Sequence, residues 1–243
     1  MRAARSLGLR AAAAVAAAVL MLVSGGCEDR QSQEQVPKPQ QSERIAGSMQ
    51  DFAKRLLEEN GDRMGDVQKA AVERAARTGK VTVADYETGM SGYKQCMLDR
   101  GYKEIILIDI GEGLKVEATH KSGTDAQEKK YGDDVWDCIS VHSQSVGALY
   151  KKQIANPSLI KDHYEAVAEC LKQKGLVDVS YTADQYRKED ASYQEYVSKK
   201  YNGKESGEWP FSFAESEYGK ANVCIYANGA LNVDPNWPWE YIY

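Results

Sequence analysis

Cysteine is the residue type that most constrains how this chain can fold. The 243-residue sequence has five cysteines, at positions 27, 96, 138, 170 and 224. No Cys-x-x-Cys pair occurs, and Cys138-x-x-x-His142 supplies only two ligands, so we predict no zinc or other metal site and no cofactor. With Cys27 set apart, as argued below, four cysteines remain. An even number indicates two disulfides, with three possible pairings, or else free thiols.

The N-terminus favours disulfides because it indicates where the protein folds. Arg2, Arg5 and Arg10 precede an uninterrupted apolar run over residues 11–23. That run is too short to span a bilayer, which takes about 20 residues, and it matches the core of a signal peptide. We therefore expect residues 1–26 to be removed on export, and disulfides form and persist outside the cytoplasm.

Ser24-Gly25-Gly26-Cys27 ends the apolar run and resembles a lipobox, the site at which bacterial lipoproteins are cleaved and lipidated. Ser24 departs from the usual leucine. The resemblance implies that Cys27 becomes the first residue of the mature chain and carries lipid such as palmitate. It also implies a cell-membrane protein on the extracytoplasmic face, with the lipid bilayer as a partner through acylated Cys27. The alternative is ordinary signal cleavage with Cys27 incidental.

The charge balance excludes one class of partner. The chain has 31 basic and 36 acidic residues and a net charge of −5; removal of residues 1–26, with three arginines and no acidic residue, makes it −8. Proteins that bind nucleic acid carry a basic face, so we predict no nucleic-acid partner. An acidic surface also gains nothing from anionic headgroups, so attachment to the membrane would depend on the lipid.

Composition and periodicity divide the mature chain. Residues 27–48 are rich in Gln, Ser, Pro and charge and predict a disordered tether, because they cannot offset their ordering entropy. From residue 49 the apolar spacing is helical. We predict an α+β fold: a helix-rich domain with one small antiparallel β-hairpin and two disulfides. It comprises an N-terminal helical segment (49–79), a first helix–hairpin–helix module (80–156) and a second helical module with an aromatic tail (157–243).

Capping patterns and hydrophobic periodicity set the expected elements. Thr82, Asn156 with Pro157, Thr182 and Ser212 are predicted helix starts. Residues 121–130 are expected to be a polar loop, and residues 134–154 one helix. Two strands, 104–110 and 114–118, flank a glycine-containing turn. The first is continuously apolar and predicted to be buried on both faces; the second alternates and is predicted to be half buried.

Two predicted helix ends share one pattern. Cys96 and Cys170 each lie five residues before a glycine, and an apolar residue follows both the cysteine and the glycine. Either a module is duplicated or both ends use a Schellman-type ending; the matched cysteines favour duplication. Each of the two cysteines is then expected to pair with the next cysteine downstream. We predict the disulfides Cys96–Cys138 and Cys170–Cys224, each contributing about 4 kcal/mol.

Asp85-Tyr86-Glu87 at a helix start, Cys96 to Gly101 at its end, and Cys138 with His142 in a later helix form a recognisable set. With the two strands between them, they resemble a family of actinobacterial-type secreted lipoproteins over about residues 80–176. The resemblance implies the fold and the extracytoplasmic location. The family has no assigned activity, so the resemblance implies no chemistry.

Candidate catalytic residues are few. His142 is predicted to be a core histidine rather than a base. Cys138 and His142 have helical i,i+4 reach, but a cysteine in a disulfide is no nucleophile. Asp133 and Asp134 are predicted to cap a helix N-terminus rather than form a catalytic dyad. No known hydrolase, metalloprotease or phosphate-loop motif occurs. We therefore predict no catalytic residue and a protein that is not an enzyme.

The C-terminal residues Trp237, Trp239, Tyr241 and Tyr243 alternate, which places their rings on one side of an extended chain. We predict that they pack against the domain. The alternative is a ligand platform formed by Trp237, Trp239 and Tyr241. The sequence thus predicts a lipid-anchored binding or scaffold protein with a protein or cell-wall partner. The alternatives are a binder of cell-wall glycan or peptidoglycan that uses the tail, and a secreted hydrolase without a recognisable motif.

Overall fold

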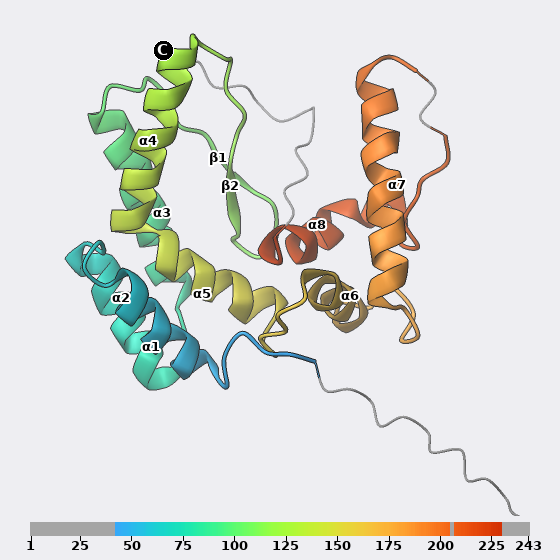
Figure 1. The fold of residues 1–243 in the computed structure, drawn as a ribbon, viewed down its shortest axis with the longest axis horizontal. Helices are drawn as coiled ribbons and strands as arrows, with labels where there is room; N and C mark the ends of the chain where they lie inside the picture. Colours follow the sequence, from blue (N-terminus) through green and yellow to red (C-terminus); the bar gives the residue numbers. More distant parts are fainter. Residues whose placement is uncertain (1–41, 205–206, 230–243) are drawn as a thin grey trace, which may run out of the picture. The chain divides into compact units, whose positions relative to one another are not determined.

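The computed structural model describes residues 42–204 and 207–229 (Figure 1). Its elements in chain order are α1 (Met49–Asn60), α2 (Asp66–Thr78), α3 (Val83–Asp99), β1 (Leu107–Asp109), β2 (Lys115–Glu117), α4 (Asp125–His142), α5 (Gln144–Ala155), α6 (His163–Gln173), α7 (Ala183–Tyr201), the 3-10 turn η1 (Glu215–Glu217) and α8 (Tyr218–Ala227). For this part of the chain, the predicted helix-rich α+β class with a small antiparallel hairpin is confirmed. The signal peptide, Cys27, Trp237, Trp239, Tyr241 and Tyr243 lie outside the described residues.

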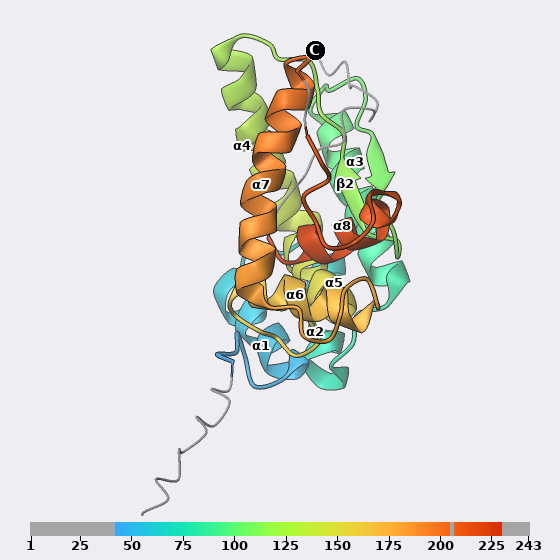
Figure 2. The same ribbon diagram turned by 90° about the vertical axis from the view of Figure 1, so that its right-hand side faces the viewer.

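Helix α5 is the centre of the main core. It contacts α1, α2, α3, α4, α6 and α8, and Figures 1 and 2 show it between the α1–α2 pair and α6. Val146, Leu149 and Tyr150 of α5 are buried, and the Tyr150 ring stacks on Tyr86 of α3 with centroids 4.3 Å apart. Within the described residues, no helix has both the length and the apolar character needed to span a membrane.

The capping residues explain where several helices begin. Thr82 and Asp85 form the predicted capping box at α3, and the Thr182 side chain accepts from the Gln185 N–H at α7. Helical spacing in the sequence predicts one apolar face formed by Val83, Tyr86, Met90, Tyr93 and Met97. On α3 this face is buried at Tyr86, Tyr93 and Met97. The predicted position of Val83 on that face is wrong: Val83 is the first residue of the helix and is exposed, because a first-turn side chain projects beyond the partner helices.

Residues 42–48, which the composition placed in the tether, lie against the loop between α5 and α6. The Ile45 N–H donates to the Leu159 carbonyl at 2.8 Å, and the Lys161 N–H donates to the Glu43 carbonyl at 2.8 Å. Arg44 and Ile160 form an antiparallel bridge between these hydrogen bonds. These backbone hydrogen bonds therefore order a segment for which the side-chain composition predicted disorder.

The hairpin is antiparallel, with Ile108 opposite Val116. The alternating second strand is half buried as predicted, with Leu114, Val116 and Ala118 inside. The prediction that the first strand is buried on both faces is wrong: Leu107 and Ile108 are only half buried. A sheet of two strands is too narrow to be covered on both faces, so the first strand is less buried than its continuously apolar sequence predicted.

The predicted single helix over 134–154 is wrong at both its start and its middle. Helix α4 begins at Asp125 inside the expected polar loop, because Thr124 and Gln127 form a capping box. It ends at His142, and α5 begins at Gln144 after a break at Ser143. Asp133 and Asp134 are therefore interior residues of α4 and do not cap its N-terminus.

Two other predicted helix starts are also wrong. The Asn156 side chain does not cap a helix; it bonds the backbone N–H and C=O of Ile160, both at 2.9 Å, and so closes a loop before α6 starts after Asp162. Ser212 does not cap α8 but hydrogen-bonds Glu189 of α7. Both side chains could cap a helix, but Asn156 hydrogen-bonds the backbone of Ile160 instead, and Ser212 hydrogen-bonds the carboxylate of Glu189.

Candidate functional site

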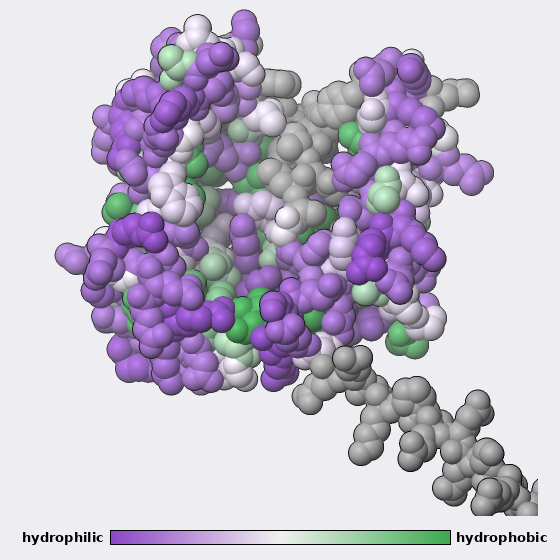
Figure 3. All heavy atoms as spheres, viewed as in Figure 1, coloured by the Kyte–Doolittle hydropathy of each residue, from purple (hydrophilic) through white to green (hydrophobic). Residues whose placement is uncertain are grey.

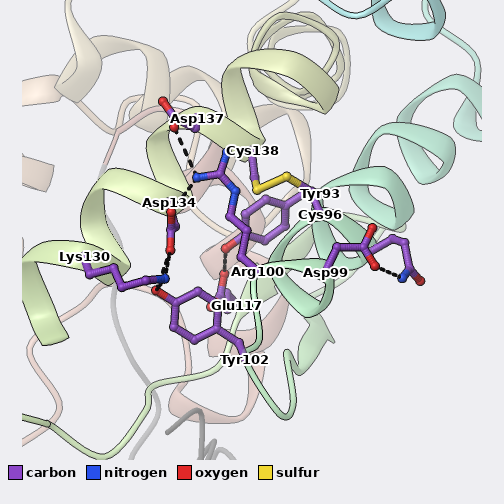
Figure 4. Close-up of a disulfide and its surroundings, with 11 residues drawn as sticks. Tyr93, Cys96, Asp99, Arg100, Tyr102, Glu117, Lys130, Asp134, Asp137 and Cys138 are labelled. Atoms are coloured by element: carbon purple, nitrogen blue, oxygen red, sulfur yellow. Dashed lines mark hydrogen bonds and ion pairs between the residues drawn. A yellow bond between two sulfur atoms is a disulfide. The ribbon is translucent and has the colours of Figure 1, made fainter.

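Cys96 of α3 and Cys138 of α4 form a disulfide with their Cα atoms 5.7 Å apart, as predicted (Figure 4). Cys138 is buried, whereas Cys96 is half buried. The hairpin lies in the chain segment between the two cysteines. The disulfide therefore joins the end of α3 to α4 and closes the chain segment that contains the hairpin.

An ionic cluster surrounds this disulfide. Asp134 accepts hydrogen bonds from Arg100, Lys130 and the Tyr102 hydroxyl, and Arg100 also reaches Asp137 at 3.1 Å (Figure 4). Burial alone would raise the pKa of Asp134, but these hydrogen bonds outweigh it and lower the pKa to about 2. Asp134 is thus ionised at any physiological pH. It stabilises the α3–α4 contact and is not a proton donor.

Glu117 of β2 connects the hairpin to the same two helices. Its carboxylate accepts from the hydroxyls of Tyr93 on α3 and Tyr131 on α4. Next to it, His120 Nε2 lies 3.0 Å from a Glu128 carboxylate oxygen, and the His120 ring lies 4.3 Å from the Tyr131 ring. These contacts hold the hairpin against α3 and α4 and give the polar side chains beside it a structural role.

The second predicted disulfide, Cys170–Cys224, joins α6 to α8 with a Cα separation of 5.6 Å, and both residues are buried. The helices α3 and α6, which carry Cys96 and Cys170, also share one ending. The N–H after the glycine donates five residues back, Tyr102 to Met97 at 3.4 Å and Leu176 to Leu171 at 3.0 Å. Both disulfide predictions are confirmed. Cys138 cannot act as a nucleophile, since its sulfur is in a disulfide.

A cavity of about 190 Å³ lies between α2, α3 and α4. Two residues of the motif set, Asp85 and His142, both line it although they are far apart in the sequence. Arg74 of α2 also lines it and forms an ion pair with Asp85. Burial would raise the pKa of Asp85, but hydrogen bonds from Thr82 and Arg74 lower it overall. The fold thus assembles one charged pair and one imidazole around a small space.

Close helix packing shapes this cavity. A Cβ atom at Gly89 would lie 2.9 Å from the His142 carbonyl oxygen, and one at Gly92 would lie 2.7 Å from His142 Nδ1. Glycine at both positions therefore lets α3 approach the end of α4 closely. Burial lowers the pKa of His142, so the ring is neutral near pH 7. The sequence predicted a core histidine, whereas His142 is half buried and lies in a cavity wall.

Gln68 has a structural role at the break between α4 and α5 that the sequence did not predict. Its side-chain amide donates to the carbonyls of Ser140 and Val141 at 2.8 and 2.9 Å and accepts from the Ser145 N–H at 2.8 Å. It therefore satisfies the backbone groups left open where α4 breaks into α5. The available signal was a polar residue on the buried face of α2, which also carries Ala71, Val72 and Ala75.

A larger groove of about 680 Å³ lies beside residues 42–44, α6 and the start of α7. Its carboxylates already have structural partners: Glu165 accepts from Ser42, Glu169 pairs with Lys172 at 2.9 Å, and Asp162 caps α6. On the face in Figure 3, hydrophobic residues occupy small separate areas. In the described ranges, no three His, Cys, Asp or Glu side chains are grouped as metal ligands would be. The α2–α3–α4 cavity is therefore the candidate site.

No protein-family model matches this chain, and no curated protein and no solved structure shows significant similarity to it. The functional interpretation thus depends on the residues and their geometry.

Proposed function

We propose that this protein is exported, is anchored to the extracytoplasmic face of the cell membrane through lipid on Cys27, and acts by binding rather than by catalysis. The observation that carries the proposal is that all four cysteines of the described residues lie in two disulfides. Disulfides persist in oxidising compartments and are rare in the cytosol. The signal-like residues 1–26 and the lipobox-like sequence before Cys27 are independent support.

The binding part of the proposal is supported by the state of the candidate acids and nucleophiles. Asp85 is ionised and held by Thr82 and Arg74. Asp134 is held by three donors, and Cys138 is in a disulfide. None of these groups is available to transfer a proton or attack a substrate. The cavity between α2, α3 and α4 remains as a place where a small molecule can bind.

A Cys27→Ser variant tests the anchor. We expect it to leave the membrane fraction and to lose incorporation of labelled palmitate, because no described helix can hold the protein in a bilayer. A Ser24→Leu variant is the matched control: it restores the usual lipobox residue and should stay in the membrane. Membrane retention of Cys27→Ser equal to that of the unaltered protein would refute the proposed anchor.

A further inference from the structure

We propose that the cavity between α2, α3 and α4 binds a small carboxylate of two to four carbon atoms. This inference rests on the proposed binding function and adds the chemical class of the ligand. It depends on three features: the volume of the cavity, the hydrogen-bonding groups that remain unused around it, and an apolar wall.

The volume limits the ligand. At about 190 Å³ the cavity equals roughly six water molecules, taken at about 30 Å³ each. Pockets for drug-sized ligands and cofactors are larger, from about 300 Å³ upward. A nucleotide, a flavin or a sugar chain is therefore too large for this cavity, whereas an acetate, propionate or butyrate ion fits.

Three polar groups on the wall have unused hydrogen-bonding capacity. The half-buried His142 ring makes no hydrogen bond with any described residue, and the same is true of the Thr88 hydroxyl. Arg74 directs one amino group to Asp85, and a guanidinium has five N–H donors in all. Solvent reaches all three groups, so a ligand would replace water there.

The charge of these groups selects a carboxylate. Arg74 is the cation of the cavity wall, and a guanidinium pairs with a carboxylate more strongly than with a neutral acceptor. Asp85 takes one amino group of Arg74 and also accepts from the Thr82 N–H at 3.2 Å, so the other N–H donors of the guanidinium remain for a ligand carboxylate. The neutral His142 ring adds a donor without adding charge.

The rest of the wall suits a short alkyl chain. Val67, Ala71 and Gly89 line the cavity without polar side-chain atoms, and the Gln68 amide beside them is already bonded to backbone groups of α4 and α5. Gly89 is confined to glycine by the approach of Val146 and the His142 carbonyl, so this part of the wall cannot be closed by a larger residue without moving α5. A ligand with one carboxylate and a short alkyl group matches both halves of the site.

Two isosteric probes, propionate and propionamide, test the ligand class by thermal shift. The purified full chain is used, from whichever cell fraction it occupies, so failure of the anchor leaves this test intact. At tenfold excess over Kd we expect propionate to raise Tm by about 3 °C. Propionamide, which lacks the charge, should raise Tm by less than a third of that. Equal shifts with both probes, or no shift with propionate, would overturn the assignment.

Two arginines on α2 give a matched pair of variants. Both are exposed, but Arg74 lines the cavity and Arg77, about one turn away, does not. We expect Arg74→Gln to abolish the propionate-induced shift and Arg77→Gln to preserve it. Because each shift is measured against the variant's own Tm, a lost Asp85 ion pair does not imitate lost binding. Equal shifts in the two variants would contradict the role of Arg74.

The imidazoles give a direct second readout, since the chain has only three histidines. In a propionate titration followed by NMR, we expect the His142 ring resonances to move with the same midpoint as the thermal shift. Those of His120, which lies at Glu128, and of His163, on α6, should stay in place. Movement of all three rings, or of the other two alone, would place binding elsewhere and refute the site.

Discussion

The α3–α4 region and the α6–α8 region are held together by the same covalent arrangement but by different noncovalent forces. Each has a cysteine five residues before a left-handed glycine, Gly101 at φ 96° and Gly175 at φ 67°, and each cysteine is bonded to the next one downstream. Around the first disulfide lie Arg100, Lys130 and Asp134. The second region includes instead an aromatic cluster between α7 and the segment before α8.

The aromatic cluster joins α7 to the segment that leads into α8. The Tyr193 ring lies 5.7 Å from Trp209 and 5.0 Å from Phe211, and Phe211 stacks on Phe213 at 4.7 Å. Phe211, Phe213 and Tyr193 are buried. Aromatic burial is neither screened by salt nor lost on protonation, whereas ion pairs are weakened by both. The two regions should therefore respond differently to the same solution change.

The largest expected effect comes from removal of either disulfide. Replacing both cysteines of one disulfide by alanine should lower the free energy of unfolding by about 4 kcal/mol in either region. The sequence separations of 42 and 54 differ too little to distinguish them, by ~0.2 kcal/mol in the chain-entropy treatment. Urea denaturation of the two double variants measures both values.

The two disulfides differ in the solvent accessibility of their cysteines, although their loop-closure entropies are nearly equal. Cys96 is half buried, whereas Cys170 and Cys224 are buried. A thiolate must reach a sulfur to reduce the bond, so Cys96–Cys138 should open first under limiting reductant, as followed by alkylation and mass mapping. Opening of Cys170–Cys224 first would contradict this ranking.

Phe211→Ala is the next strongest change. Loss of a buried ring at the centre of the aromatic cluster should cost about 3 kcal/mol, measured by denaturation. The cost should be the same at low and at high salt. A cost that falls markedly with salt would show that the second region depends on charge after all.

Asp134→Asn tests the ionic region. We expect a loss of about 2 kcal/mol at neutral pH, because three charged or hydrogen-bonded partners lose their carboxylate. The pKa of Asp134 is about 2 in the folded protein against an ordinary 3.8. Its contribution is therefore complete above pH 4 and is lost as the pH falls toward 2.

Asp137→Asn is the matched control for that variant. Asp137 also contacts Arg100, at 3.1 Å, but 61% of its side chain is exposed, against 13% for Asp134. Its replacement should change stability by less than about 0.5 kcal/mol. Equal losses in the two variants would show that Arg100, and not the half-buried Asp134 carboxylate, organises the cluster.

The smallest expected effect is the pH response of His142. Because burial lowers its pKa below the ordinary 6.5, unfolding takes up a proton there, and stability falls as the pH drops below about 6.5. His142→Asn should flatten this part of the stability–pH curve. A curve that is unaltered in His142→Asn would contradict the lowered pKa.

Local signals predicted much of this fold. The capping patterns at Thr82 and Thr182 and the glycines after Cys96 and Cys170 each act within one helix turn, so the sequence displays them directly. The cysteine pairing followed from the repeated helix ending. The Thr124 capping box was equally local, but the polar character of residues 121–130 obscured it.

The wrong predictions lie where contacts between parts distant in the sequence determine the local structure. Asn156 and Ser212 have capping chemistry, yet their hydrogen bonds go to Ile160 and to Glu189. The α4–α5 break is satisfied by Gln68, which is more than 70 residues away in the sequence. The candidate cavity depends on how α2, α3 and α4 meet, and no periodicity or motif encodes that meeting.

The most direct test of the account is the intact mass of the native protein isolated from the membrane fraction without reductant. We predict a chain that begins at Cys27, carries acyl groups, and has lost four hydrogens to the disulfides Cys96–Cys138 and Cys170–Cys224. A chain that retains residues 1–26, or that takes up alkylating reagent on all four cysteines before reduction, would contradict it.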